Sequence, residues 1–256
     1  GEKKTEVVGS GLIFRDYASY VPGDDFKHID WKVYGRTDRL VVKRFEEDRN
    51  LTVHVLIDFS GSMNFGAKLK KSDYASMIGL GFIYIALKNN ERFVLSTFDD
   101  SLDFFQAKKG SKNLMSIVEY LNSKKPRGKS NFQDALSKYK SLITSKALVV
   151  VISDFLYDAV IIQEFLYRFR NNKIKLVQVL DKTERKMDLD GDYELVDLET
   201  EDVLKTYVDP VVRKNYLNDL DRHNARIKEL CEDIGADFYT VSNDESIFDV
   251  FYKILN

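Results

Sequence analysis

The side chains best suited to chemistry lie in segment 58–62, where one carboxylate and two hydroxyls alternate. Asp58, Ser60 and Ser62 directly follow the apolar stretch 51–57, which has the length and composition of a buried strand. All three side chains are hard oxygen donors. Mg²⁺ takes about six such oxygens and usually keeps several waters among them. Alone, the pattern also fits a strand end followed by a hydroxyl-rich turn, so a metal site requires further donors.

Two more oxygen donors follow predicted elements further along the chain. Ser130 stands between the polar loop 124–129 and a predicted helix, and Asp154 ends the apolar stretch 149–153. Either residue could simply cap the turn that follows it. In a parallel sheet, however, the carboxyl ends of the strands lie at one edge, where ligands bind. The combined set predicts an Mg²⁺ or Mn²⁺ site made of Asp58, Ser60, Ser62, Ser130 and Asp154.

Strands and helices must alternate to position these donors, and after about residue 50 the hydrophobic periodicity predicts such an alternation. Strands are predicted at 51–57, 93–98, 102–106, 147–152, 174–180 and 237–241. Helices are predicted at 72–87, 114–121, 132–143, 159–170, 209–234 and 247–255, with Ser72 and Asp209 as N-caps. The alternation predicts an α/β fold with a doubly wound, mostly parallel sheet.

Two segments lie outside this alternation. The stretches 193–198 and 203–208 have the two-residue period of strands and predict an antiparallel hairpin, inserted near 192–208. A calcium loop starting at 188 is rejected because Tyr193 occupies the place that needs glycine. Before residue 50, short strands at 12–14 and 40–45 flank a turn-rich middle. We therefore expect a small β-rich segment, 1–50, followed by a domain at 51–256.

The composition argues against several classes of protein. With 39 Lys plus Arg against 41 Asp plus Glu, the net charge of −2 disfavours nucleic-acid binding. Cys231 is the single cysteine and the three histidines are dispersed, so neither a disulfide nor a zinc site is expected. The longest apolar run, 77–87, is shorter than the roughly 20 residues that a membrane span needs. We expect a protein without a membrane span, in a reducing compartment such as the cytoplasm.

The predicted metal ligands resemble the metal-ion-dependent adhesion site (MIDAS) of von Willebrand factor A domains. That site joins a D-x-S-x-S sequence to a later Thr and a later Asp, and Ser130 stands here in place of the Thr. The resemblance covers residues 51–256 in element order. It implies a Rossmann-like fold whose Mg²⁺ binds a carboxylate of a partner.

The first fifty residues contain a second, longer signature. It comprises the stretches Tyr20-Val21-Pro22-Gly23-Asp24-Asp25, Ile29-Asp30-Trp31-Lys32, Arg36-Thr37 and Leu40-Val41-Val42-Lys43. This signature resembles that of the DUF58 family, whose members place it directly before a von Willebrand A-type domain and are commonly encoded beside a MoxR-type AAA+ ATPase. The resemblance implies partnership with that ATPase in chaperone-like remodelling or complex maturation.

Two groups of residues are candidates for docking a partner. The basic loop before Ser130 should lie on the rim of the metal site and favour a carboxylate-bearing ligand; its charges are Lys124, Lys125, Arg127 and Lys129. The second group either orders the N-terminal lobe through charge-assisted hydrogen bonds or forms a docking face; it comprises Asp24, Asp25, Trp31 and Arg36.

The sequence thus predicts a non-enzymatic, metal-dependent adaptor that binds an Asp or Glu of a client or of the ATPase. The alternative is an Mg²⁺-dependent phosphotransferase or phosphatase with Asp58 as nucleophile. Such enzymes generally carry a second Asp two residues later, where this chain has Ser60. No other general base is evident beside the proposed metal, which favours the adaptor.

Overall fold

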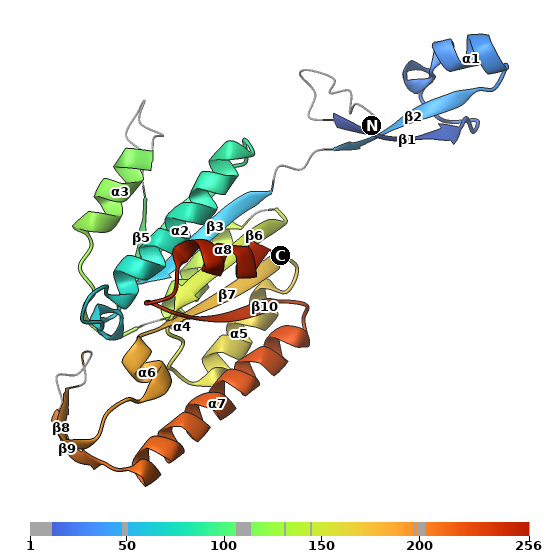
Figure 1. Cartoon of the computed structure of the whole chain (residues 1–256). Coiled ribbons are helices and arrows are strands. Elements are labelled where there is room, and N and C mark those ends of the chain that lie inside the picture. Colours follow the sequence, from blue (N-terminus) through green and yellow to red (C-terminus); the bar gives the residue numbers. More distant parts are fainter. Residues whose placement is uncertain are drawn as a thin grey trace. The chain divides into compact units, whose positions relative to one another are not determined.

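The structure is a computed structural model that describes residues 12–47, 51–105, 114–130, 132–143, 145–196, 198 and 203–255 (Figure 1). The chain forms two compact units, Gly1–Asn50 and Leu51–Asn256. The second unit carries all of the predicted metal ligands.

A six-stranded sheet organises the second unit, with the order β10-β7-β6-β3-β4-β5. Neighbours from β10 to β4 run parallel, and β5 runs antiparallel to β4. This confirms the predicted doubly wound α/β fold. The strands are β3 (Thr52–Asp58), β4 (Phe93–Phe98), β5 (Leu102–Phe104), β6 (Ala147–Ser153), β7 (Lys173–Leu180) and β10 (Asp237–Ser242).

Helices cover both faces of this sheet, because successive side chains of a strand point to opposite faces. Val55 and Ile57 of β3 belong to one apolar core, and Leu56 between them belongs to the other. The first core is covered by α2 (Lys71–Lys88), α3 (Leu114–Ser123) and α8 (Ile247–Leu255). The second is covered by α4 (Phe132–Tyr139), α5 (Ala159–Phe169) and α7 (Pro210–Glu232).

The direction of strand addition reverses between β3 and β6. From β3 the chain continues to β4 on one side, whereas β6, β7 and β10 are added on the other side. Ligands of open α/β sheets bind beyond the carboxyl ends of the strands at such a reversal. Asp58 ends β3 and Asp154 follows β6, so both carboxylates flank this point.

Helix α2 connects β3 to β4 and contains the apolar run 77–87. A Cβ at Gly79 would lie 2.6 Å from Ile57 Cδ1, so glycine permits the close approach of α2 to β3. The prediction that Ser72 is the N-cap is wrong: the helix starts at Lys71, and its N-cap, Lys70, makes no side-chain capping bond. Within the described residues, no helix is long and apolar enough to cross a membrane.

Two other predicted boundaries differ in the structure. The helix predicted at 132–143 ends as an α-helix at Tyr139 and continues as the 3₁₀-helix Lys140–Leu142. The strand predicted at 102–106 ends at Phe104, and residue 106 lies outside the described residues. Helix ends often tighten into 3₁₀ geometry, which hydrophobic periodicity does not reveal.

The predicted hairpin is present as β8 (Gly191–Val196) and β9 (Val203–Val208), which pair antiparallel with Leu195 opposite Leu204. Before it lies a helix that periodicity missed, α6 (Lys182–Lys186). Asp181 and Glu184 form a capping box at its start, and this spacing was the available signal. The helix is only five residues long, so it shows no hydrophobic period.

In the first unit, β1 (Leu12–Ser19) pairs antiparallel with β2 (Val41–Glu47). The middle, which was expected to be turn-rich, also holds a 3₁₀-helix, Phe26–His28, and the helix α1 (Trp31–Thr37). Asp30 begins α1 because its carboxylate accepts hydrogen bonds from the backbone amides of Lys32 and Val33.

We expect His54 in β3 to make folding stability fall at acidic pH. Burial lowers the pKa of His54 to about 4, and its ring hydrogen-bonds the Tyr139 hydroxyl at 3.0 Å. The unfolded chain, with an ordinary histidine, then binds more protons, so stability falls as pH drops from about 6.5 to 4. The full loss is on the order of 3 kcal/mol.

The measurement is urea unfolding of the wild type and His54→Asn between pH 4 and 7. Relative to the wild type, the variant should become progressively more stable as the pH falls across this range, because it lacks the contribution of His54. Thr52→Asn, which changes a residue of β3 without a titratable side chain, is the control and should keep the wild-type slope. Identical slopes for all three proteins would contradict the expectation.

Candidate functional site

The segment after β3 presents the first three candidate ligands. Asp58 is fully buried, and its Oδ1 accepts a hydrogen bond of 2.8 Å from the backbone amide of Ser60. Ser60 precedes a 3₁₀-helix, Gly61–Asn64, which carries Ser62. The hydroxyl oxygens of Ser60 and Ser62 are 3.2 Å apart. This turn therefore folds the two hydroxyls back beside the carboxylate.

The end of β6 supplies the second carboxylate. Asp154 Oδ2 accepts a hydrogen bond of 2.6 Å from Ser62 Oγ, and Ser153 Oγ donates to Asp58 Oδ2 at 2.7 Å. Phe155 has a left-handed φ of +51°, which is uncommon for a residue other than glycine. Its amide donates to Ser153 Oγ at 3.0 Å. Ser153, the last residue of β6, therefore contacts Asp58, and Asp154, which follows it, contacts Ser62.

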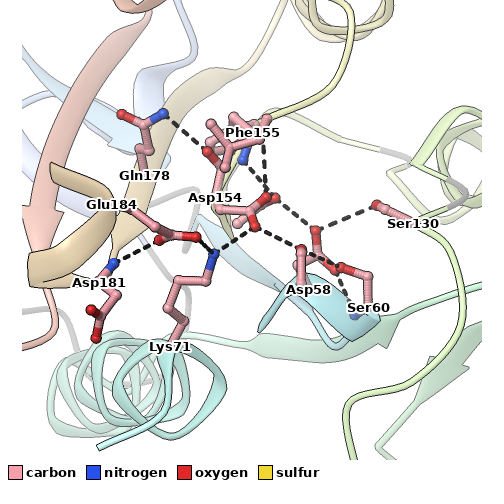
Figure 2. A network of polar contacts seen from close by, with 12 residues as sticks. Asp58, Ser60, Lys71, Ser130, Asp154, Phe155, Gln178, Asp181 and Glu184 are labelled. Atoms are coloured by element: carbon pink, nitrogen blue, oxygen red, sulfur yellow. Dashed lines mark hydrogen bonds and ion pairs between the residues drawn. The ribbon is translucent and has the colours of Figure 1, made fainter. Parts of the chain in front are cut away.

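Ser130 joins the site through a loop held by backbone hydrogen bonds. The amide of Arg127 donates to Phe59 O, and the amide of Gly61 donates to Gly128 O, each at 2.9 Å. Ser130 Oγ then lies 3.4 Å from Asp58 Oδ2, a long hydrogen bond. The structure therefore brings all five predicted ligands together. Figure 2 shows Asp58, Ser60, Ser130 and Asp154 of this group.

Sequence reasoning missed two charged residues beside the site. Lys71 is fully buried, and its ammonium donates to Asp154 Oδ2 at 2.9 Å and to Glu184 Oε1 at 2.7 Å. Figure 2 shows Lys71 and Glu184 on one side of Asp154, with Asp58 and Ser130 on the other. Glu184 Oε2 also accepts from the backbone amide of Asp181 at 2.8 Å. A lysine in a first helical turn is ordinarily exposed, so its position gave no signal.

The electrostatics of the cluster favour an added cation. Burial raises the pKa of Asp58 to about 7, and the negative charge of Asp154 acts in the same direction. Burial alone would lower the pKa of Lys71, but the carboxylates of Asp154 and Glu184 raise it above its ordinary value. The cluster thus contains three carboxyl groups, those of Asp58, Asp154 and Glu184, but one ammonium, which pairs with Asp154 and Glu184 only. Among the described residues, no basic side chain forms an ion pair with Asp58.

The donor chemistry fits Mg²⁺ or Mn²⁺. Carboxylate and hydroxyl oxygens are ligands that these hard cations accept, and a divalent ion would offset the uncompensated negative charge. In the described part of the chain, no three His, Cys, Asp or Glu side chains converge as a metal cluster. An ion at this place would therefore depend on the serine hydroxyls together with Asp58 and Asp154.

The basic loop before Ser130 is less uniform than its sequence indicates. Lys124 donates to Asp103 Oδ2 at 2.6 Å and lies 5.0 Å from the centre of the Tyr120 ring, so its charge is already engaged. Lys125, Arg127 and Lys129 are exposed. Arg127 is the closest of these to a carboxylate, 4.0 Å from Asp99 Oδ2. The exposed members of the loop remain candidates for attracting an acidic partner.

In the first unit, the candidate docking residues have separate roles. Asp24 and Asp25 each accept a backbone amide hydrogen bond at 3.0 Å, from Val21 and Lys27. Arg36 Nε donates to the Lys32 carbonyl at 3.2 Å. Trp31 is 60% exposed, with its ring edge against Tyr34.

Buried ordering of the lobe, one of the two roles considered for this group, is provided by the neighbouring Asp30. It is 7% exposed, and its Oδ2 binds the Tyr17 hydroxyl at 3.0 Å and Lys43 Nζ at 3.1 Å. Trp31 is therefore available for contact with a partner, whereas Asp30 stabilises the lobe.

Comparison with protein families matches residues 16–226 to the family described as "Protein of unknown function DUF58". An uncharacterised protein of Mycobacterium tuberculosis is 23% identical over 230 residues, which cover 88% of this chain and 73% of that protein. The uncharacterised protein YeaD of Bacillus subtilis is 25% identical over 122 residues, or 45% of this chain and 29% of YeaD.

Among solved structures, the conserved hypothetical protein BatB of Bacteroides thetaiotaomicron is similar with a TM-score of 0.50 and 12% identity. The match covers 80% of this chain and 97% of BatB. A manganese-loaded TRAP protein of Plasmodium vivax is similar with a TM-score of 0.39 and 16% identity, over 50% of this chain and 57% of TRAP. The likeness to BatB shows a shared fold.

Proposed function

The chain belongs to the DUF58 family and has a von Willebrand A-like fold, and from this premise we propose that it is a metal-dependent protein-binding adaptor. Asp58, Ser60, Ser62, Ser130 and Asp154 would hold Mg²⁺ or Mn²⁺. The bound ion would supply an open coordination position for an Asp or Glu of the partner. Hydrogen bonds from the Ser60 amide and the Ser153 hydroxyl orient the Asp58 carboxylate, and Lys71 offsets part of the negative charge of Asp154.

The observation that carries the proposal is the convergence of these five side chains at the reversal between β3 and β6. They come from three separate segments of the chain, yet hydrogen bonds of 2.6–3.4 Å connect them. A buried carboxylate without a basic partner is costly, because burial penalises its charge. Asp58 is such a group among the described residues, and a divalent ion beside it would remove the cost.

For the partner, we propose a MoxR-type AAA+ ATPase or a client of that ATPase. The support is the DUF58 signature in the first unit, because members of this family are commonly encoded beside such an ATPase. The exposed charges of Lys125, Arg127 and Lys129 near Ser130 would speed the approach of an acidic surface. We also propose that the adaptor acts in the cytoplasm with the ATPase.

The proposal is tested by measuring binding to a MoxR-type AAA+ ATPase of the same organism by calorimetry, in Mg²⁺ and in EDTA. Chelation should weaken binding at least tenfold. Ser130→Thr keeps the hydroxyl and should bind within about threefold of the wild type, whereas Ser130→Val, which has the shape of Thr without the donor, should lose at least tenfold.

Calorimetry should also detect the divalent ion itself, and a bound ion at 100 times its Kd adds about 2.7 kcal/mol to the unfolding free energy. If millimolar Mg²⁺ and Mn²⁺ give neither heat nor a rise in Tm, the metal site is wrong. If binding to the ATPase survives chelator and Ser130→Val unchanged, docking does not use the metal.

We expect no phosphatase turnover with Mg²⁺. Asp58 is fully buried, and both of its oxygens already accept hydrogen bonds, which is unfavourable for a nucleophile. The check is hydrolysis of p-nitrophenyl phosphate and acetyl phosphate by the wild type and Asp58→Asn. Turnover by the wild type that disappears in the variant would favour the phosphotransferase function instead.

A further inference from the structure

An apolar pocket adjoins the candidate metal site and shares a wall with it. Its volume is about 270 Å³. This is below the roughly 300–1,000 Å³ of sites for drug-sized small molecules, but it suits one large side chain. The apolar lining comes from four parts of the second unit and consists of Phe65, Met187, Leu189, Leu198 and Tyr216.

The pocket is formed by the segment that interrupts the α/β alternation. Met187 ends α6 in a left-handed conformation with φ +47°, which turns the chain towards Leu189. Arg213 of α7 donates to the Leu189 carbonyl and fixes this turn against α7. Phe65 and Leu198 are 38% and 39% exposed, so apolar surface remains open to solvent at the pocket. The hairpin region thus adds a recognition surface beside the sheet.

The polar end of the pocket carries little free charge. Ser62, a candidate metal ligand, and Glu184 both line it. Both Glu184 oxygens are occupied, one by the Lys71 ammonium and the other by the Asp181 amide. Lys71 also pairs with Asp154, so it offsets only part of the negative charge of Glu184 on this wall. An ion held by Ser62 would add positive charge on the same side.

We propose that this pocket receives a large apolar side chain of the same partner segment whose carboxylate reaches the metal site. The proposal rests on the proposed function and specifies the partner's sequence. Ser62 is both a candidate metal ligand and a residue of the pocket wall, so the carboxylate and the apolar side chain of the partner must lie close together. Consecutive Cα atoms are 3.8 Å apart. The two partner residues are therefore neighbours or one residue apart. The recognised segment contains Asp or Glu within two positions of Leu, Ile, Met or Phe. An apolar anchor in a pocket beside a polar contact is the usual form of a binding hot spot.

The test selects a randomised ten-residue peptide display library on the full chain in Mg²⁺, with a parallel selection in EDTA. We expect enrichment of an acidic residue within two positions of a large apolar residue, and loss of this enrichment in EDTA. The affinity of an enriched peptide is then measured by fluorescence anisotropy. Replacing its apolar residue by Ser should weaken binding about tenfold to a hundredfold.

Two pocket variants make the test specific. Leu189→Ser removes part of the wall and Thr183→Phe fills the space, and both should weaken the enriched peptide at least tenfold. Met115→Ser, which changes a 63% exposed side chain of α3, is the matched control and should leave affinity unchanged. Circular dichroism and the Mg²⁺-induced rise in Tm should remain as in the wild type for all three variants.

The outcomes separate this inference from the proposed function. If acidic residues are enriched and EDTA-sensitive, but no apolar neighbour is selected and both pocket variants bind normally, the pocket inference is wrong and the adaptor proposal stands. If no acidic residue is selected and EDTA has no effect, the proposed function itself fails. If the chain forms a dimer that Leu189→Ser dissociates, the occupant is a second copy, which overturns the inference.

Discussion

Lys71→Met should lower the unfolding free energy by about 3–5 kcal/mol, the usual cost of leaving a buried charge without its partner. The ammonium of Lys71 is fully buried between Asp154 and Glu184, at 2.9 and 2.7 Å. Methionine fills similar space but leaves both carboxylates uncompensated. In a domain of this size, such a loss lowers Tm by roughly 6–20 °C. The measurement is urea and thermal unfolding in EDTA, which excludes any compensation by metal.

Two comparisons assign the loss to the ion pairs. Lys70→Met changes the exposed neighbouring lysine and should cost less than about 1 kcal/mol. Glu184→Gln should be mild alone, because its side-chain oxygen can still accept from the Asp181 amide. Combined with Lys71→Met, it should recover part of the loss, since one fewer buried charge is left unpaired. Equal small losses for Lys70→Met and Lys71→Met would contradict the assignment.

Asp58→Asn should stabilise the metal-free protein while removing its response to Mg²⁺. The folded pKa of Asp58 is raised from 3.8 to about 7, so the folded chain holds this proton more tightly than the unfolded chain does. Stability therefore falls as pH rises from about 4 to 7, and the full cost is present above pH 7. Asparagine carries no charge and can keep the hydrogen bonds to Ser60 and Ser153.

At pH 8 in EDTA the variant should exceed the wild type by a few kcal/mol, and near pH 4 the two should converge. Adding Mg²⁺ should raise the Tm of the wild type but not that of Asp58→Asn. Asp73→Asn, which changes an exposed acid of α2, is the control and should keep the metal response. A metal-free Asp58→Asn that is less stable than the wild type at pH 8 would contradict this account. A gain in stability with a loss of binding is common where function maintains a strained site.

The sequence predicted the sheet well because parallel strands buried on both faces are continuous apolar runs. The stretches 51–57, 147–152 and 174–180 are of this kind, and each appears as a strand within a residue or two of the prediction. Asp58 and Asp154 could be placed at the site because they follow two of these runs. That they bind a metal remains a prediction.

Other features of the structure depend on contacts between residues that are distant in sequence, which a local sequence pattern does not predict. Lys71 is buried only because Asp154 and Glu184, distant in sequence, surround its ammonium. The prediction of Ser72 as N-cap followed residue preference, but the helix already starts at Lys71, the residue whose ammonium makes these tertiary contacts. In the first unit, the Pro22-Gly23 turn and the charges around it concealed α1, although Asp30 is a favourable N-cap. The pocket arises from side chains of four elements and has no sequence signature.

The ion pairs of Lys71 also constrain the order in which the site can be completed during synthesis. The lysine emerges early, but its partners belong to the end of β6 and to α6, which are translated much later. Until then its ammonium must remain hydrated, and the start of α2 lacks the contacts that bury it. A nascent chain on the ribosome therefore cannot display the finished site before α6 has left the exit tunnel. A partner that binds at the candidate metal site would therefore bind only chains that have folded most of the second unit.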